Sequence, residues 1–319
     1  MSYKPIPTVV PKDGFSASED GQALRAAMKG IGTDEAAIIE ILTARTNAQR
    51  QEIAKFFTSE YGRNLIDDLK SELGGKFESV IVALMQPPFE FLAHHLHKAM
   101  KGLGTDDQAV IEILCTRNKA EIQEIVDTYW RLYDRPLAEH ICTETSGDFR
   151  RFLTLLVTGV RDEPGVVSVE KAKEDAQLLY NAGEGKLGTD EEVFNKILSH
   201  DSYEQLRIVF EEYKNLAGRT IEQSLKNELS GALLNAYLGV VECVQCPVTY
   251  LAKQLHNAVK GFGTDNNTLI RIIVSRSEID LGNIKQEYER LYDKTLESVV
   301  KSETSGDYKK ALVALIGGP

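Results

Sequence analysis

The sequence predicts an all-α protein built from four copies of one repeat, each with about five short helices. Three observations support this prediction. A glycine-threonine-aspartate loop recurs four times along the 319 residues. Apolar residues follow every copy of the loop at the i, i+3, i+4 spacing of one helix face. The alternation of apolar and polar residues that is typical of strands is absent. Together these patterns are typical of a helical repeat array.

The loop reads MKGIGTDE at 28–35, MKGLGTDD at 100–107, GKLGTDEE at 185–192 and VKGFGTDN at 259–266. We take its second glycine as the marker of each copy: Gly32, Gly104, Gly188 and Gly263. The markers are 72, 84 and 75 residues apart, and the longest interval contains a Pro-Gly breaker at 164–165. These intervals predict a tail at 1–14, repeats at 15–86, 87–158, 170–243 and 247–317, and a linker at 159–169.

The helix after each loop is expected to begin at the threonine that follows the marker glycine. Threonine is a favourable N-cap, and acidic residues in the first turn complement the helix dipole. The apolar residues six, nine and ten positions after each marker predict the inner face of this helix. They are Ile38, Ile41 and Leu42; Val110, Ile113 and Leu114; Phe194, Ile197 and Leu198; and Leu269, Ile272 and Ile273.

A second motif closes each repeat: SELGG at 71–75, TETSG at 143–147, NELSG at 227–231 and SETSG at 302–306. An apolar stripe at i, i+3, i+4 and i+7 follows it in the same phase every time and predicts the last helix of the repeat. One helix before the first loop and two in the middle complete the expected five.

The distance from the marker glycine to the acid of the second motif does not vary. Each acid lies 40 residues after its marker, although the spacing between repeats drifts; the acids are Glu72, Glu144, Glu228 and Glu303. A glycine-rich turn lets the backbone approach a ligand closely. Such a turn suits either a phosphate on backbone N–H groups or a hard cation on backbone carbonyls.

The carboxylate separates these two ligands, because an acid repels phosphate but completes the oxygen shell that Ca²⁺ prefers. Mg²⁺ requires a tighter octahedron and keeps its waters, so calcium is the expected ion. The sequence contains no EF-hand and no nucleotide-binding motif. One carboxylate with a few carbonyls predicts weak binding and an incomplete shell, which lipid phosphate oxygens would complete.

The formal net charge of −11 argues against a nucleic-acid partner and against attachment to anionic lipid through basic clusters. A bridging ion would supply the local positive charge instead. The sequence shows no signal peptide and no apolar stretch long enough to cross a bilayer. We therefore expect a cytoplasmic protein that becomes peripheral on membranes when calcium is raised.

One apolar residue stands between the glycines of every loop: Ile31, Leu103, Leu187 and Phe262. One interpretation is that these side chains contact the membrane, where full burial of each would contribute about 1.5–3 kcal/mol. The other is that they fold back onto their own helices. The sequence favours neither interpretation.

Four repeats with the pattern (M/V)KGxGTD, and an acid 40 residues further on inside E[LT][GS]G, resemble the annexin family over about residues 15–317. The short tail is similar to that of invertebrate and short vertebrate members. The resemblance implies a slightly curved disc with calcium loops on its convex face. It also implies that three loop carbonyls and one bidentate carboxylate hold each principal ion. These ligands would be Met28, Gly30, Gly32 and Glu72; Met100, Gly102, Gly104 and Glu144; and Val259, Gly261, Gly263 and Glu303.

The third repeat departs from the family pattern, because a lysine stands where the other repeats have glycine. Its implied ligands are Gly183, Lys186, Gly188 and Glu228, and the lysine implies a different turn. Secondary calcium sites in the family use the threonine carbonyl and the acid two residues further on. In the first repeat these are Thr33 and Glu35.

Charged residues thirteen positions after the markers form another pattern. Arg45, Arg117 and Arg276 are expected to pair with acids, and Asp201 reverses the charge in the third repeat. In the HHLH segment only His94 and His97 share a helix face, which favours a solvated or interface face over a metal site. Trp130 is expected in the core.

Three functions remain in competition. The first is calcium-dependent binding of anionic, phosphatidylserine-type phospholipid through Ca²⁺ bridges, in membrane organisation or trafficking. Self-association on the membrane stays open, and no catalysis is expected, because no nucleophile–base–acid set has supporting spacing. The alternative is a helical-repeat scaffold for protein partners without direct lipid binding. The third and least favoured is a phosphate-ester enzyme that uses the Gly-x-Gly turns.

Overall fold

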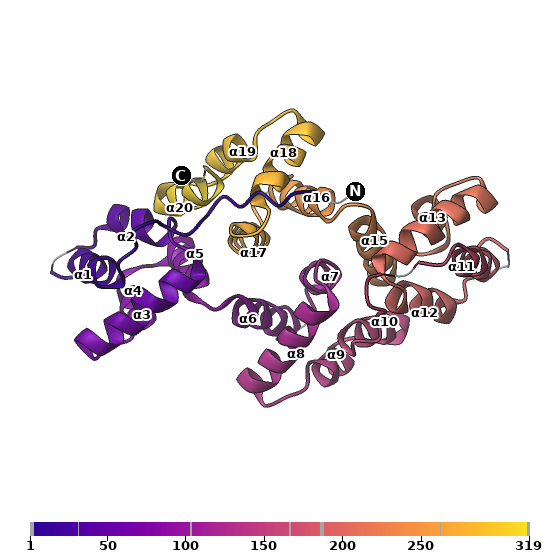
Figure 1. Ribbon diagram of the computed structural model, residues 1–319, viewed down its shortest axis with the longest axis horizontal. Coiled ribbons are helices and arrows are strands. Elements are labelled where there is room, and N and C mark those ends of the chain that lie inside the picture. Colours follow the sequence, from indigo (N-terminus) through magenta and orange to yellow (C-terminus); the bar gives the residue numbers. More distant parts are fainter. Residues whose placement is uncertain are drawn as a thin grey trace. The chain divides into compact units, whose positions relative to one another are not determined.

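The computed structural model describes residues 3–30, 32–102, 104–165, 167–185, 188–261 and 263–317 (Figure 1). Within these ranges the chain forms twenty α-helices and no strand. The prediction of an all-α protein with five helices in each of four repeats is therefore confirmed for the described residues.

The helices form four sets of five in the same order. The first loop joins the first and second helix of a set, and the second motif joins the fourth and fifth. The first set is α1 (Ala17–Ala27), α2 (Glu35–Leu42), α3 (Asn47–Tyr61), α4 (Leu65–Glu72) and α5 (Gly75–Met85). The second is α6 (Pro88–Met100), α7 (Asp107–Cys115), α8 (Lys119–Tyr133), α9 (Leu137–Glu144) and α10 (Gly147–Val157). The third is α11 (Val169–Ala182), α12 (Glu191–His200), α13 (Tyr203–Ala217), α14 (Ile221–Glu228) and α15 (Gly231–Gln245). The fourth is α16 (Pro247–Val259), α17 (Asn266–Arg276), α18 (Leu281–Tyr292), α19 (Leu296–Glu303) and α20 (Gly306–Gly317).

The chain divides into two compact units. The terminal unit contains the chain up to Phe91 and from Leu251 onward, and the central unit contains Leu92–Tyr250. In the terminal unit, α5 packs against α17 and α20, and α2 packs against α20. In the central unit, α10 packs in the same way against α12 and α15, and α7 against α15. Each unit is thus a pair of helix sets joined through their second and fifth helices.

The packed faces carry the predicted apolar stripes. The twelve stripe residues of the second helices are at most 8% exposed. The stripes of the fifth helices are also buried, apart from the half-buried Leu233 in α15. Burial of one such side chain contributes about 1.5–3 kcal/mol, so the paired stripes form the core of each unit. Trp130 is 50% exposed, and its predicted core position is wrong. It follows Tyr129 directly and so falls outside the buried face of α8, which is formed by Ile122, Ile125 and Tyr129.

The N-caps of the second helices differ from the prediction. Asp34, Asp106 and Asp265 cap α2, α7 and α17, and each carboxylate accepts a hydrogen bond from the backbone N–H three residues on at 3.0–3.1 Å. The expectation that the preceding threonines are the caps is therefore wrong. Because the aspartate takes the cap, the threonine hydroxyl is available for another partner.

A non-helical segment, which we call a strap, precedes the first set at residues 3–16 and the third set at residues 158–165 and 167–168. In the tail, Thr8 and Val9 donate their backbone N–H groups to the Ser277 carbonyl at 2.8 and 3.0 Å. The Gly282 N–H donates to the Ile6 carbonyl at 2.8 Å. A Cβ at Gly282 would lie 2.7 Å from that carbonyl oxygen, so only glycine permits this approach. The tail is thereby attached to the fourth set within the terminal unit.

One glutamine holds each strap. The Lys12 N–H donates to Gln49 Oε1, and Gln49 Nε2 donates to the Lys12 carbonyl, both at 3.1 Å. Ser168 and Gln205 form the same pair of hydrogen bonds in the linker, both at 2.9 Å. Both glutamines lie 17 residues after their markers, so two straps of unrelated sequence are held at equivalent positions.

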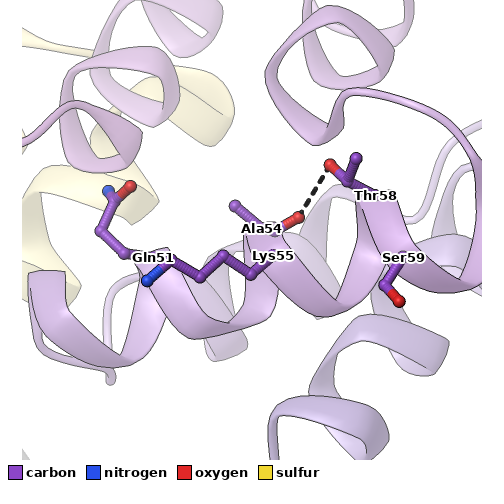
Figure 2. A pocket seen from close by; sticks show the side chains of 5 residues that line it. All are labelled: Gln51, Ala54, Lys55, Thr58 and Ser59. Atoms are coloured by element: carbon purple, nitrogen blue, oxygen red, sulfur yellow. Dashed lines mark hydrogen bonds between the residues drawn. The ribbon is translucent and has the colours of Figure 1, made fainter.

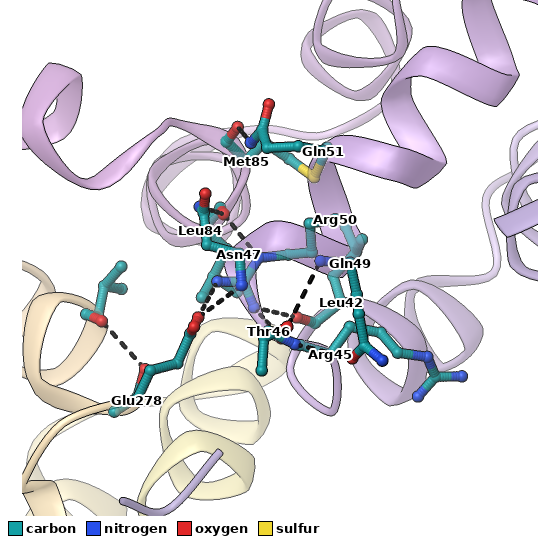
Figure 3. A network of polar contacts seen from close by, with 12 residues as sticks. Leu42, Arg45, Thr46, Asn47, Gln49, Arg50, Gln51, Leu84, Met85 and Glu278 are labelled. Carbon is teal, nitrogen blue, oxygen red and sulfur yellow. Dashed lines mark hydrogen bonds and ion pairs between the residues drawn. The ribbon is translucent and has the colours of Figure 1, made fainter. Parts of the chain in front are cut away.

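Arg50 joins the first and fourth sets inside the terminal unit (Figure 3). Its guanidinium donates to the carbonyls of Leu84 at 2.7 Å and Leu42 at 3.1 Å, to the Arg45 carbonyl, and to Glu278 Oε1 at 2.9 Å. The side chain is 2% exposed, and this burial lowers the pKa of Arg50 to about 10 despite the ion pair with Glu278. The buried charge is therefore held by three carbonyls and one carboxylate.

The arginines thirteen residues after the markers were expected to pair with acids, and Arg45 and Arg276 do so. Arg45 contacts both oxygens of Asp20 at 2.6 and 2.8 Å, and Arg276 contacts both oxygens of Asp280 at 2.7 Å. All four residues are buried. Arg117 donates to the hydroxyl of the neighbouring threonine at 3.0 Å.

In the third set the reversed charge is matched by a lysine. Lys171 Nζ lies 2.8 Å from Asp175 Oδ2 and also contacts Asp201 Oδ1. Both aspartates are buried, and Asp175 occupies the place in α11 that Asp20 occupies in α1. Burial raises the pKa of Asp201, while its hydrogen bond with Lys171 acts in the opposite direction.

Candidate functional site

The first loop of each set closes on itself through the backbone. The aspartate N–H donates to the carbonyl seven residues earlier: Asp34 to Ala27 at 2.9 Å, Asp106 to Ala99 at 2.8 Å, and Asp265 to Ala258 at 2.8 Å. Two glycines in each of these loops have left-handed φ angles, 111° and 89° at Gly30 and Gly32. No atom lies within 4 Å of a Cβ built on either glycine, so backbone conformation and not space requires glycine there.

The second motif lies against the first loop, as the constant spacing predicts. The Thr33 hydroxyl donates to the Glu72 carboxylate at 3.0 Å. Thr105 donates to the main-chain carbonyl of Glu144 at 3.1 Å, and Thr264 donates to that of Glu303 at 3.4 Å. The threonines that do not cap their helices therefore connect two loops that are 39 residues apart in sequence.

The residues expected to hold an ion occupy these two loops in the first, second and fourth sets. Met28, Met100 and Val259 have buried side chains, so they anchor the start of each loop in the core. The glycines that follow are exposed, as are Glu72 and Glu303, whereas Glu144 is half-buried. Glu35 begins α2, two residues after Thr33. Exposed backbone oxygens beside one carboxylate form a hard donor set, which fits Ca²⁺ better than a transition metal.

The loop of the third set is one residue longer. Here Asp190 donates to the carbonyl of Ala182, eight residues earlier, at 2.7 Å. Gly183 is buried and Gly188 has a φ of 83°. In place of the threonine contact, Glu184 accepts a hydrogen bond from Ser224 in α14 and lies 3.3 Å from the Arg219 guanidinium. Among the described residues, no hydrogen bond links Thr189 with Glu228, so this loop pair is joined differently.

Five predicted residues lie outside the described ranges. They are the apolar loop residues Ile31, Leu103, Leu187 and Phe262, and the proposed ligand Lys186.

A chain of aromatic side chains leads to Glu144 in the second set, and the sequence interpretation missed its last member. His97 stacks on Tyr133 with ring centroids 3.9 Å apart, and its Nδ1 lies 3.1 Å from the Tyr129 hydroxyl. The same hydroxyl hydrogen-bonds Nδ1 of His140, and Nε2 of His140 lies 3.9 Å from Glu144 Oε1. The signal for His140 was its i, i+4 relation to Glu144 on a helix.

The two HHLH residues on one face contact tyrosines. Nδ1 of His94 lies 2.6 Å from the Tyr133 hydroxyl, and His97 contacts Tyr129 as described. Burial lowers the pKa of His97, and the neighbouring His140 adds to the effect. Burial likewise lowers the pKa of His140, with Arg135 contributing. Both lowered pKa values favour neutral rings at physiological pH.

Other features of the described residues do not compete with the loop pairs. A shallow hollow of about 410 Å³ lies on α3 and is lined by Gln51, Ala54, Lys55, Thr58 and Ser59 (Figure 2). It contains none of the predicted site residues. In the described part of the chain no three His, Cys, Asp or Glu side chains gather as a metal site. No helix there has the length and apolar character needed to cross a bilayer.

Comparison with known proteins places these loops in one family. The annexin family model matches residues 19–84, 91–156, 174–240 and 250–315. The chain is 60% identical to annexin B10 of Drosophila melanogaster over 319 residues, 99% of both chains. It is similar to the structure of annexin III, with 48% identity, a TM-score of 0.96 and coverage of 98% of this chain and 97% of that one. It is also similar to calcium-bound annexin (Sm)1, with 34% identity, a TM-score of 0.88 and coverage of 99% and 94%. The four loop pairs and the four matched segments coincide, and the chain belongs to the annexin family.

Proposed function

We propose that this protein binds anionic phospholipid, of the phosphatidylserine type, through calcium ions held at its loop pairs. Annexin family membership supports calcium-dependent phospholipid binding in general. The observation that carries the proposal for this chain is the Thr33–Glu72 hydrogen bond, which joins a glycine turn to a carboxylate.

The proposed ligands are the loop carbonyls and glutamates that the family pattern implies. In the first set they are Met28, Gly30, Gly32 and Glu72, and the second and fourth sets use the equivalent residues. Thr33 and Glu35 form a secondary site. The third set uses Gly183, Lys186, Gly188 and Glu228 in its longer loop.

Calcium bound at these loops would supply positive charge and coordination positions that lipid phosphate oxygens can fill. The loops themselves contribute only one carboxylate each, so they leave such positions open. The net charge of −11 does not oppose this attachment, because charges further than about 8 Å away are screened at physiological salt.

The membrane attachment we propose is peripheral and occurs from the cytoplasm when calcium rises, in membrane organisation or trafficking. The apolar loop residues Ile31, Leu103, Leu187 and Phe262 would add to it by entering the lipid interface. Self-association on the membrane surface is an extension of the same proposal.

Pelleting with phosphatidylserine-containing vesicles tests the proposal. We expect the protein to pellet with calcium and to be released by chelator, and not to pellet with pure phosphatidylcholine. The combined variant Glu72→Gln and Glu144→Gln should need more calcium for the same binding. Glu60→Gln is the control, because Glu60 is an exposed acid on α3 that belongs to neither loop.

Equal pelleting in calcium and in chelator would refute the proposal. If neither condition gave pelleting, the scaffold interpretation would gain support, since it needs the fold but not the ion.

A further inference from the structure

The aromatic cluster of the second set has a counterpart in the fourth. His256 stacks on Tyr292 with ring centroids 3.7 Å apart, and its Nδ1 lies 3.4 Å from the Tyr288 hydroxyl. These three residues occupy the same positions relative to their marker glycine as His97, Tyr133 and Tyr129. The two sets therefore share a common arrangement of helices α6 with α8 and α16 with α18.

One residue separates the two clusters. Four residues before the glutamate of the second motif, the second set has His140 and the fourth set has Val299. The cluster therefore extends to the Glu144 carboxylate in the second set and stops at Tyr288 in the fourth. Thr143 adds a hydroxyl 3.3 Å from Glu144 Oε1. In the described part of the chain no hydrogen bond reaches the Glu303 carboxylate.

The number of protons on the Tyr129 hydroxyl limits which tautomers the two histidines of the second set can adopt. The Tyr129 hydroxyl has one proton and contacts Nδ1 of both His97 and His140. It donates to one ring and accepts from the other. If it accepted from His140, the lone pair of Nε2 would face the Glu144 carboxylate at 3.9 Å. If it donates to His140, an Nε2–H faces that carboxylate, which is the electrostatically favourable choice.

We infer that Tyr129 and His140 position the Glu144 carboxylate for its ion, and that this makes the second loop pair a better-ordered site than the fourth. The inference rests on the proposed function. Tyr129 sets the tautomer of His140, and the Nε2–H dipole restrains the carboxylate over a distance longer than a hydrogen bond. His140 is 5% exposed, so the restraint acts where water screens it little.

Half-maximal calcium for vesicle pelleting measures the effect in a protein that keeps a single principal glutamate. The triple variant Glu72→Gln, Glu228→Gln and Glu303→Gln keeps the second site. In this background His140→Val, which copies the fourth set, should raise half-maximal calcium about tenfold. His140→Gln should restore most of the affinity, because its amide keeps an N–H near the position of Nε2.

The fourth set offers the reverse experiment. In the background Glu72→Gln, Glu144→Gln and Glu228→Gln, Val299→His completes the cluster beside Tyr288 and His256. We expect it to lower half-maximal calcium about threefold. Thermal unfolding of each variant without calcium shows whether it is folded, and Tyr129→Phe provides a second test if His140→Val is not.

A readout independent of calcium is the imidazole tautomer, measured by ¹⁵N NMR on histidine-labelled protein at pH 8 in chelator. We expect the Nε2–H tautomer at His140, the Nδ1–H tautomer at His97, and a loss of this preference in Tyr129→Phe. An Nδ1–H tautomer at His140 would overturn the inference. So would equal half-maximal calcium in the parent and in His140→Val. If the protein with all four glutamates failed to pellet with calcium, the proposed function would be wrong. The tautomer measurement would still test whether Tyr129 and His140 are arranged to position Glu144.

Discussion

In the first and third sets, the corner between the second and third helices packs on an aspartate of the first helix. The corner residue is Arg45 in one set and Asp201 in the other. Arg45 neutralises Asp20 directly, while Asp201 adds a second buried acid beside Asp175. The third set resolves this with Lys171, which reaches both acids from α11. The comparison shows that a cation contacts the buried acid at both corners, although a different helix supplies it in each set.

The largest expected effect comes from breaking the first corner. Arg45→Met leaves Asp20 buried at 8% exposure with no cation, and removal of one partner of a buried ion pair costs about 3–5 kcal/mol. The midpoint of urea unfolding, followed by circular dichroism, should fall accordingly. The double variant Arg45→Met with Asp20→Leu should recover much of the loss. A single variant as stable as the parent would show that the corner does not need its charge neutralised.

Breaking the corner of the third set should lower the free energy of unfolding by less, and the loss should depend on pH. Lys171→Met removes a half-exposed cation, and we expect a cost of about 2 kcal/mol at pH 7.5. Burial raises the pKa of Asp201 above its usual 3.8, so its ionised form is unfavourable in the fold at neutral pH. This unfavourable contribution disappears as the pH falls through the folded-state pKa.

The loss in Lys171→Met should therefore shrink between pH 7.5 and pH 5, and Asp201→Asn should restore stability in the same background. A loss that grows on acidification would contradict the assignment of Lys171 as the partner of the two acids.

Loss of the strap glutamine should cost stability in both sets, and more in the first. Gln49→Ala and Gln205→Ala each remove two hydrogen bonds to a strap, at a cost of about 1–2 kcal/mol. Gln49→Ala also removes the capping-box hydrogen bond from the Thr46 N–H, so its loss should be the larger. Urea unfolding measures this, and limited proteolysis reports release of residues 3–12 or 161–168. Gln22→Ala, an exposed change on α1, is the control. Cleavage of only one strap would show that their equivalence is geometric and not energetic.

The smallest effect is expected where α3 and α13 end. Gly62 and Gly218 have φ angles of 63° and 71°, and no atom lies within 4 Å of a Cβ at either position. Substitution by alanine therefore costs only backbone strain, about 1 kcal/mol in each set. Urea midpoints of Gly62→Ala and Gly218→Ala should drop by the same small amount. A markedly larger drop in one would reveal a difference between these helix ends that the backbone angles do not show.

The helices could be predicted from the sequence because their apolar stripes keep one phase after markers at constant spacing. The contact between first loop and second motif could also be predicted, since a fixed 40-residue distance was kept while other distances varied. The sequence predicted that Arg45 pairs with an acid, but it did not identify that acid as Asp20. Lys171 was not foreseen, because it lies 30 residues before Asp201 and nothing local connects them.

The predictions that were wrong or missing also have physical explanations. Threonine and aspartate are both good N-caps, and local propensity does not decide between neighbours. In the folded chain Asp34 caps the helix, and the Thr33 hydroxyl donates to Glu72, which lies 39 residues away in sequence. Trp130 was predicted in the core, but the register of α8 turns it outward. His140 was overlooked because its role depends on Tyr129, which belongs to another helix.

The Thr33–Glu72 contact has a consequence for the timing of a response. Bringing together two loops that are roughly forty residues apart costs conformational entropy. Folding of the protein covers this cost before any ligand binds. A ligand that bridges the two loops then has little left to order, so capture and release need no refolding step. If calcium bridges these loops as we propose, we therefore expect binding and release to proceed without refolding of the loop pair.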